Sequence, residues 1–433
     1  MFPVRRRRFA AVTATAAVLA LTAAGCGSSG STEPAAGGSA SKPSGEITVL
    51  TNRTDLVNTT FKDYKKTFEA KYPDVKVSFE AITDYEGEVK TRMNTKDYGD
   101  VLLLPNSVSA TDLPSFFEPL GTVSDLSKKY RFLDPSGQVY GLATFGNARG
   151  MVYNKKVFAD AGITALPKTP DEFIADLQAI KAKTSAVPLY TNYKDGWPAT
   201  WPQDVMGAFS GDANALVAMS KSDAPWAAGQ EKNTIDSLLY DIAAKGLIEK
   251  DPTTTNWENS KNLIATGKIG VMVLGSWAIP QMQDAAKAAK GDPATIGFMP
   301  LPVQVGGKYQ STVAGDYRIG ININSGHKAA ARAWLDWFVN DSGYYKAVGG
   351  LPTLKSLPTP AGLKDFEALG VTYVEMTPSP KLSVIDKAAE IGVSQPDYYR
   401  ELIDSARGAS KKTKQQIFDN LNSKWAAARA KVG

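Results

Sequence analysis

The stretch from residue 46 to residue 104 holds three strand patterns: EITVLT at 46–51, VKVSF at 75–79 and DVLLL at 100–104. The first two alternate apolar and polar side chains, as half-buried strands do, and the third is almost continuously apolar, as a parallel strand buried on both faces is. Helical patterns separate them, with Phe61, Tyr64 and Phe68 at helical spacing within 56–72 and a second helix around Met93. Strand and helix alternate, which predicts an α/β domain with right-handed crossovers.

Further strand and helix patterns follow along the chain. Thr169 precedes Pro170 at a helix start, where threonine caps well and proline fits the first turn. Strands are expected at 269–274 and 318–323. Two later helices carry apolar stripes that we expect to be core, formed by Trp334, Trp337 and Phe338 and by Ile417, Leu421 and Trp425.

The composition is that of a globular protein with two or three domains. The 433 residues are 43% hydrophobic and 21% charged, which excludes a mainly disordered chain and a polytopic membrane protein. The single cysteine excludes a disulfide scaffold, and the single histidine excludes a histidine-rich metal site. An oxygen-rich calcium or magnesium site is the metal option that remains, and we expect no cofactor.

The net charge needs a correction for the N-terminus. It is +5, but Arg5–Arg8 contribute four positive charges, so the rest of the chain carries 5 − 4 = +1. A nearly neutral body has no electrostatic footprint for nucleic acid, and we expect no nucleic-acid partner.

The first 45 residues resemble an export and tethering segment. A basic stretch at 1–8 precedes an apolar stretch at 9–24, FAAVTATAAVLALTAA, which is too short for a typical spanning helix and is typical of a secretory signal. A single transmembrane anchor is the alternative interpretation. Residues 27–44 are rich in Gly, Ser, Ala and Pro, which predicts a flexible tether.

The sequence TAAGC at 22–26 resembles the lipobox of bacterial lipoproteins, with Ala23 in place of the usual leucine. The resemblance implies that residues 1–25 are a signal peptide and that Cys26 is lipidated and becomes the mature N-terminus. Residues 26–45 would then be the lipidated cysteine and its tether, holding the protein to the membrane. The pattern RRRF at 6–9 partly resembles a twin-arginine signal, so the export route stays open between the general and the twin-arginine pathway.

Signatures of catalysis are missing from the sequence. No G-x-x-x-x-G-K-[ST] loop, no G-x-S-x-G elbow in the body, no H-E-x-x-H pair and no D-x-D-x-D-G loop occurs. His327 lies in the polar segment NSGHK and is expected to be an exposed turn residue. Since a glycosidase needs only two carboxylates about 5–10 Å apart, a glycoside hydrolase stays open as the enzyme alternative.

Candidate site residues follow from the ends of strands, because ligands in open α/β sheets bind beyond the carboxyl ends of the strands. The residues that come directly after predicted strands are Asn52, Arg53, Asp55, Asn106, Ser107 and Trp277. Asp316 and Tyr317 precede the strand at 318–323. The segment YTNYKDGWPATW at 190–201 adds Trp197 and Trp201 as candidates. It shows neither helical nor strand periodicity and is expected to be a surface loop, where tryptophan side chains are not needed for a core and are therefore candidates for ligand contact.

An ordered set of segments resembles the extracellular solute-binding proteins of ABC importers, in the sugar-binding, maltose-binding-protein-like group. These segments are FEAKYPDVKV at 68–77, YGL at 140–142, MVYNKKVF at 151–158, PKTPDEF at 167–173, GVMVLGSWA at 270–278, MPLP at 299–302, GININ at 320–324 and GLP at 350–352. The resemblance implies a two-lobed periplasmic-binding-protein-like fold of type II, with ligand between hinge-linked lobes. The first lobe is expected at 46–148 plus 303–342 and the second at 149–302 plus 343–433.

The resemblance also implies site residues and a function. Asn147 falls where a relative has a carboxylate, and Asp195 and Trp197 align with an acid and an aromatic that contact sugar. We expect a monomeric, lipid-anchored receptor on the extracytoplasmic face of the cell membrane that binds a carbohydrate, passes it to an ABC permease and is not an enzyme. Besides the hydrolase, a binding protein for a cationic solute such as a polyamine is the remaining alternative.

Overall fold

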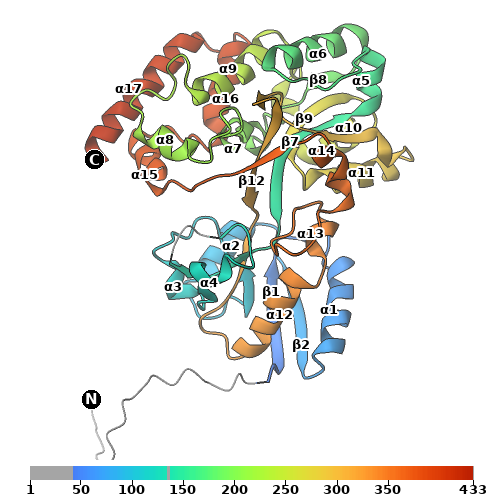
Figure 1. Ribbon diagram of the computed structural model, residues 1–433, viewed down its shortest axis with the longest axis vertical. Coiled ribbons are helices and arrows are strands. Elements are labelled where there is room, and N and C mark those ends of the chain that lie inside the picture. The colour runs from blue at the N-terminus through green and yellow to red at the C-terminus, as the bar shows by residue number, and fades with distance from the viewer. Residues whose placement is uncertain (1–41, 134–136, 433) are drawn as a thin grey trace, which may run out of the picture. The chain divides into compact units, whose positions relative to one another are not determined.

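The computed structural model describes residues 42–133 and 137–432 (Figure 1). The expected signal peptide and Cys26 lie outside the described residues. Among the described residues, no helix has both the length and the apolar character needed to cross a bilayer.

A five-stranded sheet forms the centre of the first lobe, in the order β2-β1-β3-β13-β6. The strand β1 pairs in parallel with β2 and β3, whereas β13 runs antiparallel to β3 and β6. These strands are β1 (Gly45–Thr51), β2 (Val75–Ala81), β3 (Val101–Leu103), β6 (Leu142–Ala143) and β13 (Arg318–Ile321). The helices and small strands of this lobe are α1 (Thr60–Lys71), α2 (Tyr85–Arg92), α3 (Leu113–Phe116), α4 (Val123–Leu126), α12 (Lys328–Asn340), α13 (Tyr344–Ala347), β4 (Gly121–Thr122) and β5 (Gln138–Val139).

A seven-stranded sheet forms the centre of the second lobe. Its main order is β11-β12-β7-β9-β8, with β10 on β7 and β14 on β12. The strands are β7 (Gly146–Asn154), β8 (Val187–Leu189), β9 (Ile269–Gly275), β10 (Ile296–Met299), β11 (Gln304–Val305), β12 (Lys308–Gly315) and β14 (Thr372–Glu375). The helices are α5 (Lys155–Ala161), α6 (Pro170–Lys183), α7 (Trp201–Asp204), α8 (Ala215–Lys221), α9 (Glu231–Ala244), α10 (Trp257–Ala265), α11 (Ala278–Ala288), α14 (Lys364–Ala368), α15 (Pro380–Ala389), α16 (Pro396–Ala406) and α17 (Lys414–Val432), with 3-10 turns at Trp197–Thr200, Pro252–Thr254, Pro293–Thr295 and Ala361–Leu363.

The predicted core stripes are buried where their spacing placed them. Trp334, Trp337 and Phe338 of α12 pack on Phe68 and its neighbours beneath the first sheet. The stripe of α17, formed by Ile417, Leu421 and Trp425, is buried in the second lobe. The α/β prediction and both stripes are therefore confirmed.

The chain passes between the lobes at three adjoining segments. Gly315 at the end of β12 pairs with Gly146 at the start of β7, and the backbone of Leu351 bonds to Gly146 from the other side. A Cβ on Gly146 would lie 2.2 Å from the ring of Phe132, so the close approach requires glycine here. Figure 1 shows β7 and β12 side by side at this junction.

Several boundaries differ from the expectations. Helix α1 begins at Thr60, because residues 54–59 form a turn after β1. Strand β12, expected in the first lobe as part of 303–342, pairs with β7 and β14 of the second sheet. Beyond residue 342, Tyr344 and Val348 still pack in the first core, so the third passage lies after them. The division into two lobes remains our interpretation, with these shifts at its borders.

Candidate ligand-binding site

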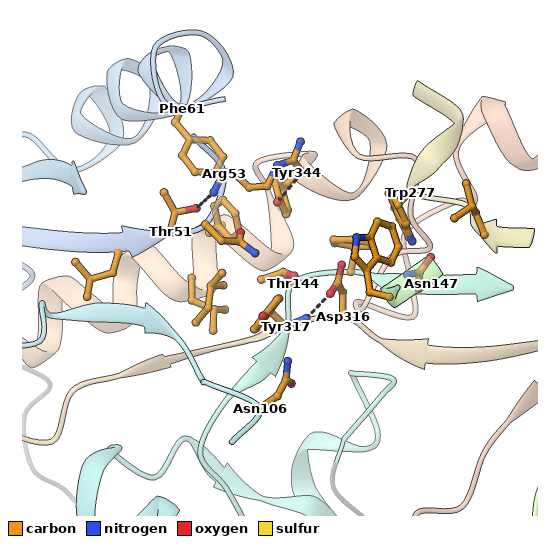
Figure 2. Close-up of a pocket in the computed structure, with 18 of the residues that line it drawn as sticks. Thr51, Arg53, Phe61, Asn106, Thr144, Asn147, Trp277, Asp316, Tyr317 and Tyr344 are labelled. Carbon is orange, nitrogen blue, oxygen red and sulfur yellow. Dashed lines mark hydrogen bonds between the residues drawn. The ribbon is translucent and has the colours of Figure 1, made fainter. Parts of the chain in front are cut away.

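A cavity of about 870 Å³, here called the main cavity, opens where the first sheet, the second sheet and the passing segments meet (Figure 2). The first lobe contributes the end of β1 and the ring of Tyr344. The second lobe contributes residues of β7, the turn after β9 and the segment 197–204. Aromatic and polar side chains share the wall, as in sites that bind small polar molecules.

Most of the candidate residues from the sequence line this cavity. Nine of the twelve do so, namely Asn52, Arg53, Asn106, Asn147, Trp197, Trp201, Trp277, Asp316 and Tyr317. Asp55, Ser107 and Asp195 are not part of its lining. The fold thus brings together side chains that are up to 265 residues apart in the sequence, from Asn52 to Tyr317.

The guanidinium of Arg53 is fixed at one wall by three hydrogen bonds to two residues. It donates to both carboxylate oxygens of Asp55, at 2.8 and 2.6 Å, and to the hydroxyl of Tyr344 at 3.3 Å. The backbone N–H of Arg53 donates to Thr51 Oγ1 (Figure 2). Burial acts to lower the pKa of Arg53, but Asp55 and Tyr344 outweigh it, so the pKa is raised and the side chain stays cationic. Asp55 therefore serves the site through Arg53.

Three tryptophan rings cluster at the opposite wall. The ring centroids of Trp197, Trp257 and Trp277 lie 4.8 to 5.7 Å apart. Trp277 is held close to the backbone, because a Cβ on Gly275 would lie 2.7 Å from the Trp277 ring and 2.3 Å from Asn147 Oδ1. Trp197 stays 43% exposed, which is unusual for tryptophan and leaves a free aromatic face.

The segment 190–201 has more structure than expected. It ends in a 3-10 turn and in α7, and Trp201 is buried in the second core while its edge lines the cavity. Asp195 accepts a hydrogen bond from the backbone N–H of Trp257 at 2.8 Å, at the start of α10. Asp195 therefore positions Trp257, whose ring packs against Trp197 and Trp277 and which the sequence analysis missed.

Asp316 is a partly buried carboxylate in the wall of the main cavity. Its Oδ1 accepts from the backbone N–H of Tyr317 at 2.8 Å (Figure 2), and no cation among the described residues lies within ion-pair distance of it. Burial raises the pKa of Asp316, against the backbone hydrogen bond from Tyr317 and the charges of Arg149 and Arg53. This carboxylate has free acceptor positions that a hydroxyl-bearing ligand would satisfy.

Tyr317 and Asn106 are linked through a residue that the sequence analysis did not name. Glu86 of α2 accepts from the Tyr317 hydroxyl at 2.8 Å and from the backbone and side-chain nitrogens of Asn106 at 3.1 and 3.3 Å. Both cavity residues are therefore held by a single carboxylate at the start of a helix. Glu86 lies on a helix and not at the end of a strand, so the strand-end criterion did not select it.

Arg149 and Asp204 are further cavity residues that the sequence analysis missed. Their side chains form an ion pair at 3.1 Å, and burial raises the pKa of Asp204 against the opposing charges of Arg149 and Lys232. Arg149 lies within β7, and a single charged residue in a strand whose neighbours are buried is the sequence feature that could have indicated it as a site residue. Among the described residues, no cluster of His, Cys, Asp and Glu is arranged to hold a metal ion.

The fold and site define a class of protein, and comparison with known families agrees. The model of the bacterial extracellular solute-binding proteins matches residues 54–345, more than half of the chain, and the chain belongs to this family. The resemblance found in the sequence is therefore confirmed.

Two solved structures of binding proteins from one organism are similar to this chain. The chain is 34% identical to the ABC-transporter binding protein BlMnBP1 of Bifidobacterium animalis subsp. lactis, solved with mannobiose, with a TM-score of 0.81 over 90% of this chain and 95% of that one. It is 32% identical to BlMnBP2 of the same organism, described as manno-oligosaccharide specific and solved with mannotriose, with a TM-score of 0.80 over 91% and 96%. The two-lobed fold is thereby confirmed.

A further relative is the diacetylchitobiose binding protein DasA of Streptomyces coelicolor, 27% identical over 68% of this chain and 70% of its own length. These three relatives are all named as binding proteins and not as enzymes.

Proposed function

We propose that this protein binds an oligosaccharide, of the manno-oligosaccharide class, in the main cavity and delivers it to the permease of an ABC importer. The observation that carries the proposal is the opposition of Trp197 and Trp277 to the polar wall of Arg53 and Asp316 in one cavity. The named ligands of the two relatives that are more than 30% identical over nine-tenths of the chain support the choice of sugar.

The residue types suit a pyranose for a physical reason. A sugar ring has an apolar C–H face, which an indole ring covers, and a rim of hydroxyls, which carboxylate, amide and guanidinium groups satisfy. Each buried polar group left unpaired costs about 1–3 kcal/mol, so the polar wall gives specificity. Arg53 and Arg149, the cations that line this cavity, are each ion-paired, and Asp316 is the one lining carboxylate among the described residues without an ion-pair partner, so a polyamine would find a single counter-charge here.

The proposal is tested by calorimetric titration of the purified protein. We expect saturable binding of mannobiose and mannotriose, weaker binding of diacetylchitobiose and none of spermidine. Trp277→Ala should weaken mannotriose at least tenfold, about 1.4 kcal/mol, because it removes the stacking face. Leu369→Ala, at an exposed site outside the cavity lining, serves as the control. Absence of binding to every sugar in the panel would refute the proposal.

The hydrolase alternative rests on Asp204 and Asp316, two carboxylates with raised pKa in one cavity. A carboxyl group with raised pKa is what a glycosidase uses as its acid. We expect mannotriose to be recovered unchanged after prolonged incubation with the protein, as chromatography would show. Release of mannose that is lost in Asp316→Asn would establish the enzyme instead.

We further propose that Cys26 carries the lipid that holds the receptor, as a monomer, to the outer face of the cell membrane. The support is the lipobox-like sequence and the tether composition. The full chain expressed in a bacterial host should sediment with membranes and be released into the soluble fraction by Cys26→Ala. Membrane association that survives this substitution would indicate a spanning anchor.

A further inference from the structure

We propose that the second lobe holds an additional oligosaccharide subsite behind the Arg149–Asp204 ion pair, which rests on the proposed function of the main cavity. The subsite would take the sugar units of a chain that extends beyond the main cavity. It defines the substrate class more narrowly, as linear oligosaccharides that gain affinity with each unit past the ion pair.

The space for this subsite is a groove of about 460 Å³, here called the side groove. It lies entirely within the second lobe, between β12, α7, α8 and α15. Its lining includes Gln203, Leu216, Thr312, Pro378, Ser383 and Ser394. Because these elements belong to one lobe, the side groove does not depend on movement between the lobes.

The side groove and the main cavity share a wall. Arg149 and Asp204 line both of them and are bonded to each other at 3.1 Å, so this ion pair forms the partition. The backbones of the pair are fixed by β12, since Ser311 Oγ donates to the carbonyl of Arg149 and Thr312 Oγ1 to that of Asp204, both at 2.7 Å. The side chains are 28% and 35% exposed and are the movable part of the wall.

The chemistry of the side groove matches a neutral sugar. Apart from the shared ion pair its lining carries no charge, and it combines hydroxyls and an amide with the apolar surfaces of proline, leucine and valine. The Oε1 atom of Gln203 is buried and has no hydrogen-bond partner. A buried acceptor without a donor is costly, and rotation of the Gln203 amide toward the side groove would let a sugar hydroxyl supply that donor.

The ion pair itself can hydrogen-bond a sugar that crosses it. A carboxylate and a guanidinium side by side offer acceptors to one hydroxyl and donors to the next, as the rim of a pyranose requires. The pair therefore acts as a junction between the two compartments.

The test is calorimetry of the purified protein with manno-oligosaccharides of two to six units. For the unaltered chain we expect affinity to rise at least tenfold between mannobiose and mannohexaose. In Ser383→Trp, which fills the side groove, the ratio of the two affinities should fall to about one. In Gln203→Ala, a milder change that keeps the fold, it should fall about threefold or more.

Val384→Trp is the matched control, because Val384 neighbours Ser383 on α15, is 53% exposed and is not part of the side groove lining. It should keep the affinity ratio of the unaltered chain. The subsite would be overturned if affinity did not rise beyond mannobiose, or if Ser383→Trp and Gln203→Ala both left the ratio of mannohexaose to mannobiose affinity unchanged. In either case, binding of mannobiose would still uphold the proposed function. Failure of every sugar to bind would overturn both.

Discussion

Asp316 is a cavity residue whose charge is expected to lower the stability of the fold. The carboxylate is partly buried, accepts one hydrogen bond from its neighbour's backbone and has no ion-pair partner among the described residues. Burial of a charge that is not fully compensated is unfavourable, and the raised pKa of Asp316 expresses that cost. The proposed ligand would supply the hydrogen bonds that this carboxylate lacks.

Asp316→Asn should therefore stabilise the ligand-free protein and weaken ligand binding. Well below pH 4 the carboxyl group is protonated in both the folded and the unfolded state, so the stability of the variant differs little from that of the unaltered protein there. As the pH rises toward the raised pKa of the folded state, the folded protein holds more protons than the unfolded chain, and the stability of the unaltered protein falls. Asp316→Asn has no carboxyl group at this position, so its stability does not fall in this pH range for this reason.

Thermal unfolding at pH 4 and pH 7 measures this effect. We expect the melting temperature of Asp316→Asn to exceed that of the unaltered protein by roughly 1–3 °C at pH 7, with a smaller difference at pH 4. Mannotriose affinity should drop about tenfold or more, as for a lost charged hydrogen bond. A variant that is less stable at pH 7 would contradict the assignment of Asp316 as a strained carboxylate.

At the scale of elements, α9 and α16 are joined by a buried polar network. Lys232 and Asp236 of α9, 1% and 0% exposed, form an ion pair at 2.9 Å. Asp236 also accepts from Trp226 Nε1 at 2.9 Å and from the Tyr398 hydroxyl, while Lys232 donates to the Tyr399 hydroxyl at 3.2 Å. Burial lowers the pKa of Lys232, against the charge of Asp236. The network fixes the relative position of the two helices.

Asp236→Ala should destabilise the protein by about 3–5 kcal/mol, because it leaves the Lys232 ammonium buried without a counter-charge. Denaturant unfolding gives the value. Asp160→Ala is the matched control, since Lys156 and Asp160 have the same spacing on α5 but are 71% and 49% exposed, and it should cost about 0.5 kcal/mol or less. Equal changes in the free energy of unfolding for the two substitutions would show that the buried network contributes no more to stability than an exposed ion pair.

Local patterns in the sequence predicted elements well and pairing poorly. The caps and stripes of α6, α12 and α17 are local, and Thr169 accepts from the backbone of Glu172 at the expected helix start. The sheet that β12 joins depends on Gly146 and Gly315, whose pairing spans 169 residues and leaves no local mark. The same holds for Arg149 and Asp204, because only the folded β7 and α7 bring them together.

At the scale of the whole molecule, three strand-like passages connect the lobes that line the main cavity. Gly146 and Gly315 pair directly, and Leu351 completes the junction. Because the ligand would contact Arg53 on one lobe and Trp277 on the other, binding favours the arrangement in which both contacts form.

We therefore expect mannotriose to reduce the radius of gyration in solution scattering. The measurement compares the protein alone, with saturating mannotriose, and with a sugar that calorimetry shows not to bind. Trp277→Ala serves as the control variant. At a mannotriose concentration far below the dissociation constant of this variant, its radius of gyration should equal that of the ligand-free protein. An unchanged radius at full saturation would mean that binding does not bring the lobes together.

The position of β13 in the first sheet has a consequence for biogenesis. Residues 318–321 lie between β3 and β6, whose own residues end at 103 and 143. A nascent chain that has left the ribosome up to residue 300 thus lacks a central strand, and β3 presents a bare edge to other chains. The first lobe must therefore await the late part of the polypeptide before its sheet is complete.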